Sequence, residues 1–185
     1  MMESVYYTST ATRLGNVGIV WRRKDGSPTV VRIFLPDEDE GTHDLIRRSF
    51  PGVVRRSHRA MEQVMRSIQG LAAGRNVTFS ENFLDMLSCG QFQRRVLSQV
   101  MGIPKGKVST YGRLAEKSRA SKGARAVGNA LAMNPYPLII PCHRVIRSDG
   151  SLGGFGGGLK MKRELLLMEG ISFDSRGKVL AKFLY

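Results

Sequence analysis

The sequence predicts an α/β (α+β) protein of two domains, a small sheet-plus-helix domain over residues 1–88 and a helical domain over residues 89–185. Three observations support this prediction. The 185 residues are 42% hydrophobic, which is enough to bury a core in more than one unit. The first half carries β-branched and aromatic runs, whereas the second half carries apolar residues at helical spacing. Positive charge is also concentrated in the second half.

The first half begins with a predicted β-hairpin. Runs 17–21 and 29–35 flank a polar loop with Asp25-Gly26. A short helix is expected over 42–50, ended by Pro51-Gly52. Residues 77–79 are expected to return to the sheet. Between them, Ser57 is expected to cap a longer helix that ends before Gly74. Its apolar residues recur at helical spacing: Met61, Val64, Met65, Ile68 and Leu71.

Charge separates the two halves. Residues 1–89 hold 12 basic and 10 acidic side chains, whereas residues 90–185 hold 17 basic and 5 acidic ones. Between Arg94 and Arg125 there are nine basic residues and one acid, Glu116. Because one sign is concentrated in one half, a polyanionic partner is favoured, and nucleic acid is a better fit than an acidic protein or an anionic membrane.

Composition also predicts a cellular context. No apolar run approaches the roughly 20 residues that span a bilayer, and the first residues lack a signal-peptide pattern. Two cysteines, Cys89 and Cys142, make neither a disulfide framework nor a zinc site. We therefore expect a protein without a membrane partner that is cytoplasmic and nucleoid-associated, or nuclear in a eukaryote.

Two short helices are predicted in the basic region. Before them, a helix with one apolar face is expected to end at Gly102 and Pro104, and a short extended segment follows at 108–110. Thr110 then provides an N-cap for a helix over 111–117, and a second helix follows over about 121–133. Two short helices joined by a tight turn indicate a helix-turn-helix. The apolar face of the preceding helix consists of Phe92, Val96, Leu97 and Val100.

The second of these helices has an unusual composition. Ala124, Val127 and Leu131 share a face that is expected to pack inward, and Arg125 points away from it. Two glycines in one helix cost roughly 1 kcal/mol each relative to alanine. Two interpretations remain open: close helix–helix packing, or a smooth face that approaches a groove wall with one arginine projecting. The small residues are Gly123, Ala126, Gly128, Ala130 and Ala132.

The candidate nucleophile follows a proline-rich segment. Prolines around an apolar run over 134–141 predict a stiff, extended chain that presents Cys142. His143 and Arg144 adjoin this cysteine. Since neighbours in a strand point to opposite faces, a direct Cys–His bond needs a turn or a bridging water. A reactive thiolate and a buried structural cysteine both remain possible on residue types alone.

A glycine-rich loop and a carboxylate complete the candidate centre. Residues 148–150 form a predicted turn, and the glycines of 153–158 indicate a flexible loop that shapes a pocket wall, because no Gly-Lys-Ser/Thr follows to hold phosphate. A helix over 159–168 ends at Glu169, with Gly170 at the stop position. A carboxylate there opposes the helix dipole by about 0.3–1 kcal/mol, which predicts a cationic or imidazole partner such as His143.

The run Pro141-Cys142-His143-Arg144-Val145 resembles the signature of the O6-alkylguanine-DNA alkyltransferases, the methylated-DNA–protein-cysteine methyltransferases. The resemblance extends over 92–170, through 109–112, 125–128, Asn134-Pro135 and Glu169-Gly170. The N-terminal half is similar to the family only in size and patterning. The resemblance implies a ribonuclease H-like first domain and a winged-helix-like second domain.

The resemblance also implies a function: direct-reversal DNA repair, in which one alkyl group passes irreversibly from O6-alkylguanine, and from O4-alkylthymine, to the acceptor Cys142. It places the helix-turn-helix in the minor groove of double-stranded DNA, with Arg125 filling the gap left by the flipped nucleotide. His143 takes the thiol proton through a water, and Glu169 orients it. Tyr111 protonates the departing guanine, and Asn134 hydrogen-bonds near the thiol.

Further residues are implied by the same resemblance. The remaining DNA contacts would be Arg94, Tyr111, Ser121, Lys122, Ala124, Ala126 and Gly128. The substrate pocket would include Pro137, Val145, Phe155, Gly156 and Gly157.

The sequence departs from the family pattern in two places. Phe155 and Gly156 stand where some members have tyrosine and serine, which removes a hydroxyl donor and puts substrate breadth in question. Some members bind structural zinc, but Cys89, His43 and His58 do not supply that set. We therefore expect no metal, and we also expect no cofactor. A monomer is expected because a protein that reacts once has no need for symmetry.

Two alternatives and one segment stay open. A non-enzymatic alkyl-lesion binder would lack Cys142. A cysteine hydrolase would use Cys142, His143 and Glu169 as a triad, but it gives no reason for an arginine on a smooth basic helix. The apolar pattern of residues 171–185 fits either a terminal strand or an interaction tail.

Overall fold

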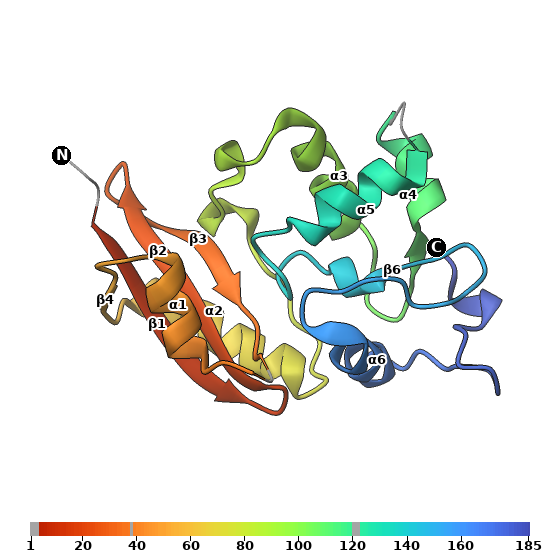
Figure 1. Cartoon of the computed structure of the whole chain (residues 1–185), viewed down its shortest axis with the longest axis horizontal. Coiled ribbons are helices and arrows are strands. Elements are labelled where there is room, and N and C mark those ends of the chain that lie inside the picture. The colour runs from red at the N-terminus through yellow and green to blue at the C-terminus, as the bar shows by residue number, and fades with distance from the viewer. Residues whose placement is uncertain (1–3, 38, 120–122) are drawn as a thin grey trace. The chain divides into compact units, whose positions relative to one another are not determined.

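The computed structural model describes residues 4–37, 39–119 and 123–185. The chain forms two compact units: residues 1–85 with 135–139, and residues 86–134 with 140–185. The boundary differs from the expected one at residue 88, and the segment 135–139, expected in the second domain, belongs to the first unit. The α/β class predicted from the sequence is confirmed (Figure 1).

The first unit is a four-stranded sheet with two helices. Its strands, in the order β3-β2-β1-β4, are antiparallel except that β4 runs parallel to β1. The predicted hairpin is β2 and β3, and Asp25 and Gly26 form its turn with φ of 50° and 78°. The elements are β1 (Val5–Thr12), β2 (Gly15–Lys24), β3 (Ser27–Phe34), α1 (Thr42–Ser49), β4 (Val54–Arg55) and α2 (Arg59–Ala72).

Two local predictions in this unit are wrong. His58, not Ser57, caps α2: its side chain accepts a hydrogen bond from the amide of Ala60. Ser57 instead donates to the carboxylate of Glu62. Residues 77–79 form no strand, because the position beside β3 is occupied by Leu84, which forms an isolated bridge with Val30.

The second unit is mainly helical. The two predicted helix-turn-helix elements are α4, whose bounds match the prediction, and α5, and α4 packs against α5 and α3. Thr110 caps α4 by accepting a hydrogen bond from the amide of Arg113 at 3.2 Å. Strands β5 and β6 form a parallel pair. The elements are α3 (Gln91–Met101), β5 (Ser109–Thr110), α4 (Tyr111–Lys117), α5 (Gly123–Ala132), β6 (Val145–Ile146) and α6 (Gly158–Met168).

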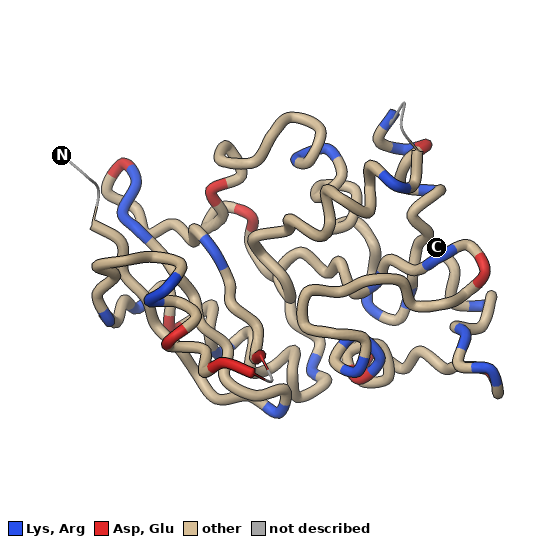
Figure 2. Tube along the Cα trace, viewed as in Figure 1, with Lys and Arg blue, Asp and Glu red and all other residues tan. Residues whose placement is uncertain are grey.

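The buried face of α5 differs from the prediction. Val127, Ala130 and Leu131 are buried, whereas Ala124 is exposed. Ala124 lies in the first turn of the helix, where its side chain borders a cavity instead of the core. Lys and Arg are spread over this unit with few Asp and Glu among them (Figure 2). The described residues also include four short 3-10 helices: Glu81–Phe83, Met86–Ser88, Cys142–Arg144 and Ala181–Phe183.

The C-terminal segment is part of the core of the second unit. Ile171 and Val179 are buried in a cluster with Val108, Ile146 and Leu166. Leu184 bridges to Val108 in parallel, which extends the edge of the short sheet. Residues 171–185 therefore form neither a terminal strand nor a free tail: they contain isolated bridges and a 3-10 helix and pack into the core of the second unit. No helix among the described residues is long and apolar enough to cross a membrane.

Candidate active site

A cavity of about 610 Å³ opens in the second unit beside the candidate nucleophile. Both the helix-turn-helix and the glycine-rich loop contribute to its wall, as the pocket-wall interpretation of that loop predicts. Its lining residues are Tyr111, Ala124, Arg125, Gly128, Asn129, Leu131, Ala132, Cys142, Arg147, Gly153, Gly154, Phe155 and Gly156.

The prediction of an extended chain over 134–141 is wrong: the backbone bends at 135–136 and turns at 138–139, where Leu138 has a φ of 72°. Cys142 then begins a 3-10 turn. The amide of Arg144 donates to the carbonyl of Pro141 at 2.9 Å, which closes the turn. Proline fixes only its own φ, so a chain with several prolines can still turn after the last one. The Sγ of Cys142 lies 3.2 Å from Nδ2 of Asn134, which also donates to the carbonyl of Ile140 at 3.2 Å.

Burial controls the protonation of the thiol. It raises the pKa of Cys142, and the hydrogen bond from Asn134 and the positive charge of Lys162 oppose this rise. The side chain is 9% exposed, and that exposed part faces the cavity. The resting group is therefore a thiol, and its nucleophilic form requires a proton acceptor nearby.

His143 is positioned to be that acceptor. Its ring is completely buried, and Nε2 lies 2.8 Å from Oε1 of Glu169. Burial lowers the pKa of His143, although Glu169 opposes this, so the ring is neutral near pH 7. Since Nε2 faces a carboxylate, it carries the hydrogen. Among the described residues Nδ1 has no hydrogen-bond partner, so its lone pair is available.

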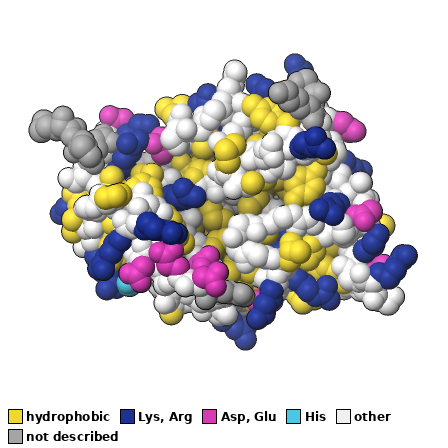
Figure 3. All heavy atoms as spheres, in the orientation of Figure 1, with side chains coloured by type: hydrophobic (Ala, Val, Ile, Leu, Met, Phe, Trp, Pro, Cys, Tyr) yellow, Lys and Arg dark blue, Asp and Glu magenta, His cyan; other side chains and the backbone are white. Residues whose placement is uncertain are grey.

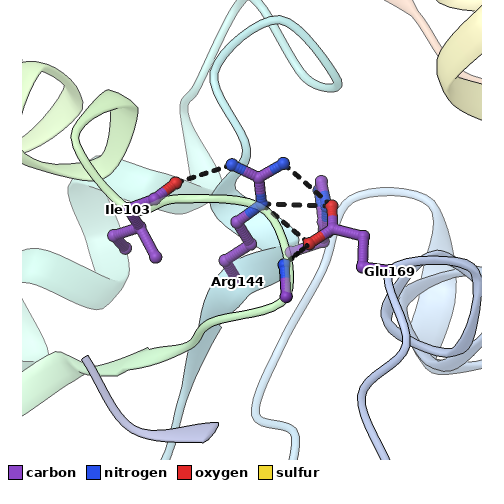
Figure 4. A network of polar contacts seen from close by, with 5 residues as sticks. Ile103, Arg144 and Glu169 are labelled. Carbon is purple, nitrogen blue, oxygen red and sulfur yellow. Dashed lines mark hydrogen bonds and ion pairs between the residues drawn. The ribbon is translucent and has the colours of Figure 1, made fainter. Parts of the chain in front are cut away.

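Glu169 is held by more groups than the sequence indicated (Figure 4). Nε of Arg144 donates to Oε2 at 2.9 Å and Nη2 donates to Oε1 at 3.0 Å, while Nη1 donates to the carbonyl of Ile103 at 2.6 Å. The amide of Gly106 also donates to Oε2, at 3.2 Å. Burial raises the pKa of Glu169, but His143 and Arg144 outweigh it and hold the value at about 2. The carboxylate is therefore ionised at neutral pH.

Lys162 is a site residue that the sequence reasoning missed. Its side chain is 0% exposed, and Nζ donates to the carbonyls of Val145, Leu152 and Gly154 at 2.6, 2.6 and 3.1 Å. Burial lowers its pKa to about 8, against the opposing effect of Cys142. One signal was available: Leu165 and Leu166 follow at helical spacing, so Lys162 lies on the apolar face of α6.

The side chain of Tyr111 lies against the glycine-rich loop. Its hydroxyl donates to the carbonyl of Gly154 at 3.4 Å. Gly153 has a φ of 68°, and a Cβ there would lie 2.8 Å from the Tyr111 ring, so only glycine allows this approach. Burial raises the pKa of Tyr111, and the hydroxyl keeps its proton at neutral pH. A protonated phenol is thus placed on the cavity wall that faces Cys142.

Some of the other expected DNA contacts line the cavity and some do not. Arg125, Ala124 and Gly128 line the cavity, whereas Ala126 and Arg94 do not. Ser121 and Lys122 fall outside the residues that the structure describes.

The expected pocket residues also divide into two groups. Phe155 and Gly156 line the cavity, and the Phe155 ring packs edge-on to His143 at 6.3 Å between centroids. Gly157 caps α6, Val145 is buried in β6, and Pro137 belongs to the first unit, so these three are not part of the lining. Val145 still contributes indirectly, because its carbonyl accepts a hydrogen bond from Lys162.

Comparison with known proteins adds independent information. Residues 91–171 match the family model of the 6-O-methylguanine DNA methyltransferase DNA-binding domain. The chain is 40% identical over 161 residues to the methylated-DNA–protein-cysteine methyltransferase of Methanothermobacter thermautotrophicus, covering 87% of this chain and 83% of that one. The corresponding protein of Sulfolobus acidocaldarius is 45% identical over 102 residues, 55% of this chain and 63% of that one.

A solved structure agrees with these matches. The Mycobacterium tuberculosis OGT in complex with DNA superposes with a TM-score of 0.70 at 27% identity, covering 89% of this chain and 92% of that chain. The likeness therefore includes both the helix-turn-helix half and the N-terminal half. On this combined evidence, the chain belongs to the methylated-DNA–protein-cysteine methyltransferase family.

Proposed function

We propose that this protein repairs DNA by direct reversal, transferring an alkyl group from O6-alkylguanine irreversibly to Cys142. One observation carries the proposal: the Cys142 thiol opens onto a cavity bordered by a helix-turn-helix arginine, while a buried imidazole–carboxylate pair lies behind it. The cavity provides space for a flipped base, and the pair provides a proton acceptor.

DNA binding is assigned to α4 and α5 of the basic second unit. On the face drawn in Figure 3, Lys and Arg side chains are more common than Asp and Glu over this unit. Small residues Ala124, Ala126 and Gly128 allow the α5 backbone to approach the minor groove. Arg125, exposed on the same helix and bordering the cavity, fills the space that the flipped nucleotide leaves in the stack.

The chemistry begins with removal of the thiol proton. The proton passes from Cys142 to Nδ1 of His143 through a bridging water, and the ionised Glu169 stabilises the imidazolium that forms. Asn134 and Lys162 stabilise the thiolate by a hydrogen bond and by positive charge. The sulfur then attacks the alkyl carbon, forming a C–S bond as the C–O6 bond breaks.

The leaving group requires a proton. Guanine leaves poorly as an anion, and the protonated hydroxyl of Tyr111 at the cavity wall delivers one. The product on Cys142 is a thioether, which has no good leaving group and cannot regenerate the thiolate. Each molecule therefore reacts once and needs no cofactor. O4-alkylthymine is a second substrate of the same type.

Intact-mass measurement after mixing with duplex DNA containing O6-methylguanine tests the proposal. We expect a mass increase of one methyl group per protein, located on Cys142 by peptide mapping, and repaired guanine in equal amount. The Cys142→Ser variant should bind the duplex and stay unmodified, because a serine hydroxyl is far harder to ionise. Repeated product release from unmodified wild-type protein would instead support a cysteine hydrolase.

The role of Arg125 is tested separately. Arg125→Ala should slow transfer from duplex DNA much more than transfer from the free base O6-methylguanine, which needs no flipping. The measurement is the single-turnover rate on both substrates at saturating DNA. Equal losses on the two substrates would reject the stacking role. A loss that disappears at saturating DNA would assign Arg125 to a simple phosphate contact.

A further inference from the structure

Arg147 borders the cavity without a role in the chemistry proposed above. It follows β6 directly, and its side chain is exposed. It lines the main cavity, an adjoining cavity of about 400 Å³, and a third cavity of about 190 Å³ that Asp149 also lines. The first two cavities share three further residues of the loop after β6: Gly153, Gly154 and Phe155.

The backbone around Arg147 is fixed by a turn. Its amide donates to the carbonyl of Ser151 at 2.8 Å, and its own carbonyl accepts from the amide of Gly150 at 3.1 Å. The side chain is thus presented from an ordered position at the end of a strand. A long cationic side chain on a fixed backbone can select an anionic group with a modest loss of conformational entropy.

The nearest carboxylate in the sequence is already engaged. Oδ1 of Asp149 accepts from the hydroxyl and the amide of Ser151 at 2.7 and 3.1 Å, and Oδ2 lies 3.1 Å from Nζ of Lys178. Within the described part of the chain, no carboxylate forms an ion pair with Arg147. Its guanidinium is therefore available to a ligand.

The charged side chains that line the main cavity and the 400 Å³ cavity are all positive. In the described part of the chain neither of these two linings includes Asp or Glu, and the main cavity has a second arginine, Arg125. The positive charge of Arg147 also acts on the site itself, since it opposes the rise that burial causes in the pKa of Tyr111 and adds to the fall that burial causes in the pKa of Lys162. Among the described residues that line the main cavity, the cationic side chains are Arg125 and Arg147, and the positive charge of Lys162 lies buried behind the loop.

We propose that Arg147 makes this cavity selective for alkyl groups that end in an anion, such as the carboxymethyl group of O6-carboxymethylguanine. This inference rests on the proposed alkyl transfer. The thiolate sulfur attacks the methylene carbon, a C–S bond forms as the C–O6 bond breaks, and guanine leaves with a proton from Tyr111. The carboxylate stays on the thioether and pairs with the guanidinium throughout. A neutral alkyl group gains nothing from Arg147.

A backbone phosphate of the flipped nucleotide is the other anion that Arg147 could bind. Free bases separate the two sources, because they carry no phosphate. The matched substrates are O6-carboxymethylguanine and its uncharged isostere O6-carbamoylmethylguanine, each in a duplex and as a free base. The proteins are the wild type, Arg147→Met and the control Arg176→Met. Arg176 is an exposed arginine whose neighbour is Asp174 and which borders none of the cavities described here.

The readout is the ratio of the single-turnover rates for the carboxymethyl and carbamoylmethyl substrates. We expect Arg147→Met to lower this ratio about tenfold on both the duplex and the free base, the size of one partly exposed charge-assisted hydrogen bond. Arg176→Met should leave the ratio unchanged. The two substrates differ in intrinsic reactivity, but this difference cancels when the ratio for one protein is divided by the ratio for another, because both proteins react with the same pair of substrates.

Three outcomes would not support the proposal, and they are distinguishable. An unchanged ratio with normal rates on both substrates overturns the anionic selectivity. An unchanged ratio with slower transfer from both duplexes, but not from free bases, assigns Arg147 to phosphate. Wild-type protein that stays unmodified with every substrate, O6-methylguanine DNA included, contradicts the proposed function itself.

Discussion

Two buried carboxylates, one in each unit, are held in similar ways and serve different ends. Asp85 in the first unit is 3% exposed and pairs with Arg22 at 2.6 Å and Lys24 at 2.9 Å. Glu169 in the second unit is 6% exposed and pairs with His143 at 2.8 Å and Arg144 at 2.9 Å. Burial raises the pKa of both carboxylates, and their partners outweigh it.

The difference lies in the partners. Arg22 and Lys24 are permanent cations, and about a third of each side chain is exposed to solvent. Because neither cation can accept a proton, the Asp85 pairs only link strand β2 to the end of segment 1–85 of the first unit. His143 is neutral, fully buried and adjacent to the nucleophile. A buried carboxylate thus becomes part of a reaction when one of its partners can gain a proton.

The largest expected effect follows from removing that partner. His143→Gln should reduce the single-turnover transfer rate by roughly 10²–10⁴-fold, the usual contribution of a general base. The control is His43→Gln, because His43 lies in the first unit and bonds to Ser9. Transfer by the His143 variant at the wild-type rate would mean that Cys142 loses its proton by another route.

Disrupting the first carboxylate should affect stability and spare chemistry. Asp85→Asn leaves two cations without their shared counter-charge, and breaking a buried pair costs about 3 kcal/mol when the cations are partly exposed. Urea unfolding followed by circular dichroism measures this loss. A variant as stable as the wild type would show that the pair contributes nothing net to folding.

The second carboxylate should make stability depend on pH. The pKa of Glu169 is about 2 in the folded protein against an ordinary value of 4.5, so its stabilisation is present above pH 4.5 and is lost as the pH falls toward 2. The shift corresponds to about 3 kcal/mol in full, of which roughly 2 kcal/mol is lost between pH 5 and pH 3. Urea unfolding at both pH values should show a loss about 2 kcal/mol larger for the wild type than for Glu169→Gln, because Asp85 titrates in both proteins.

The smallest effect concerns the buried lysine. Lys162→Met should lower the rate of Cys142 alkylation by iodoacetamide at pH 7 by about tenfold, since a nearby cation favours the thiolate. The matched control is Lys160→Met, an exposed lysine on the same helix. The wild-type advantage should shrink above pH 8, where Lys162 loses its charge. Equal alkylation rates for the two variants at pH 7 would show that Lys162 does not favour the thiolate and only stabilises the loop after β6 through its hydrogen bonds.

The sequence predicted those elements that depend on local signals. The α4 bounds followed from the Thr110 cap, and the β2–β3 turn followed from Asp25-Gly26. The partner of Glu169 followed from the unfavourable position of a carboxylate at a helix C-terminus. The first two signals lie within a few residues of the feature that they determine, whereas the third predicts the kind of partner that Glu169 needs, which lies 26 residues away.

The missed features depend on contacts between distant residues. Strand β1 was missed because, of its eight residues, only Tyr7 is buried, which leaves little hydrophobic alternation. The three carbonyls around Lys162 come from β6 and the loop after it, and spacing alone does not bring them together. The turn at Cys142 was missed because proline content predicts stiffness without predicting direction.

The most direct test of the contrast between the two carboxylates is the transfer rate of Glu169→Gln beside that of Asp85→Asn. Both folded variants are mixed with saturating O6-methylguanine duplex at pH 7, and the single-turnover rate of methyl transfer to Cys142 is measured. We expect a loss of roughly 10–100-fold for Glu169→Gln, because the imidazolium loses its counter-charge, and less than about twofold for Asp85→Asn. Equal rates for the two variants would contradict the assignment of Glu169 to the reaction.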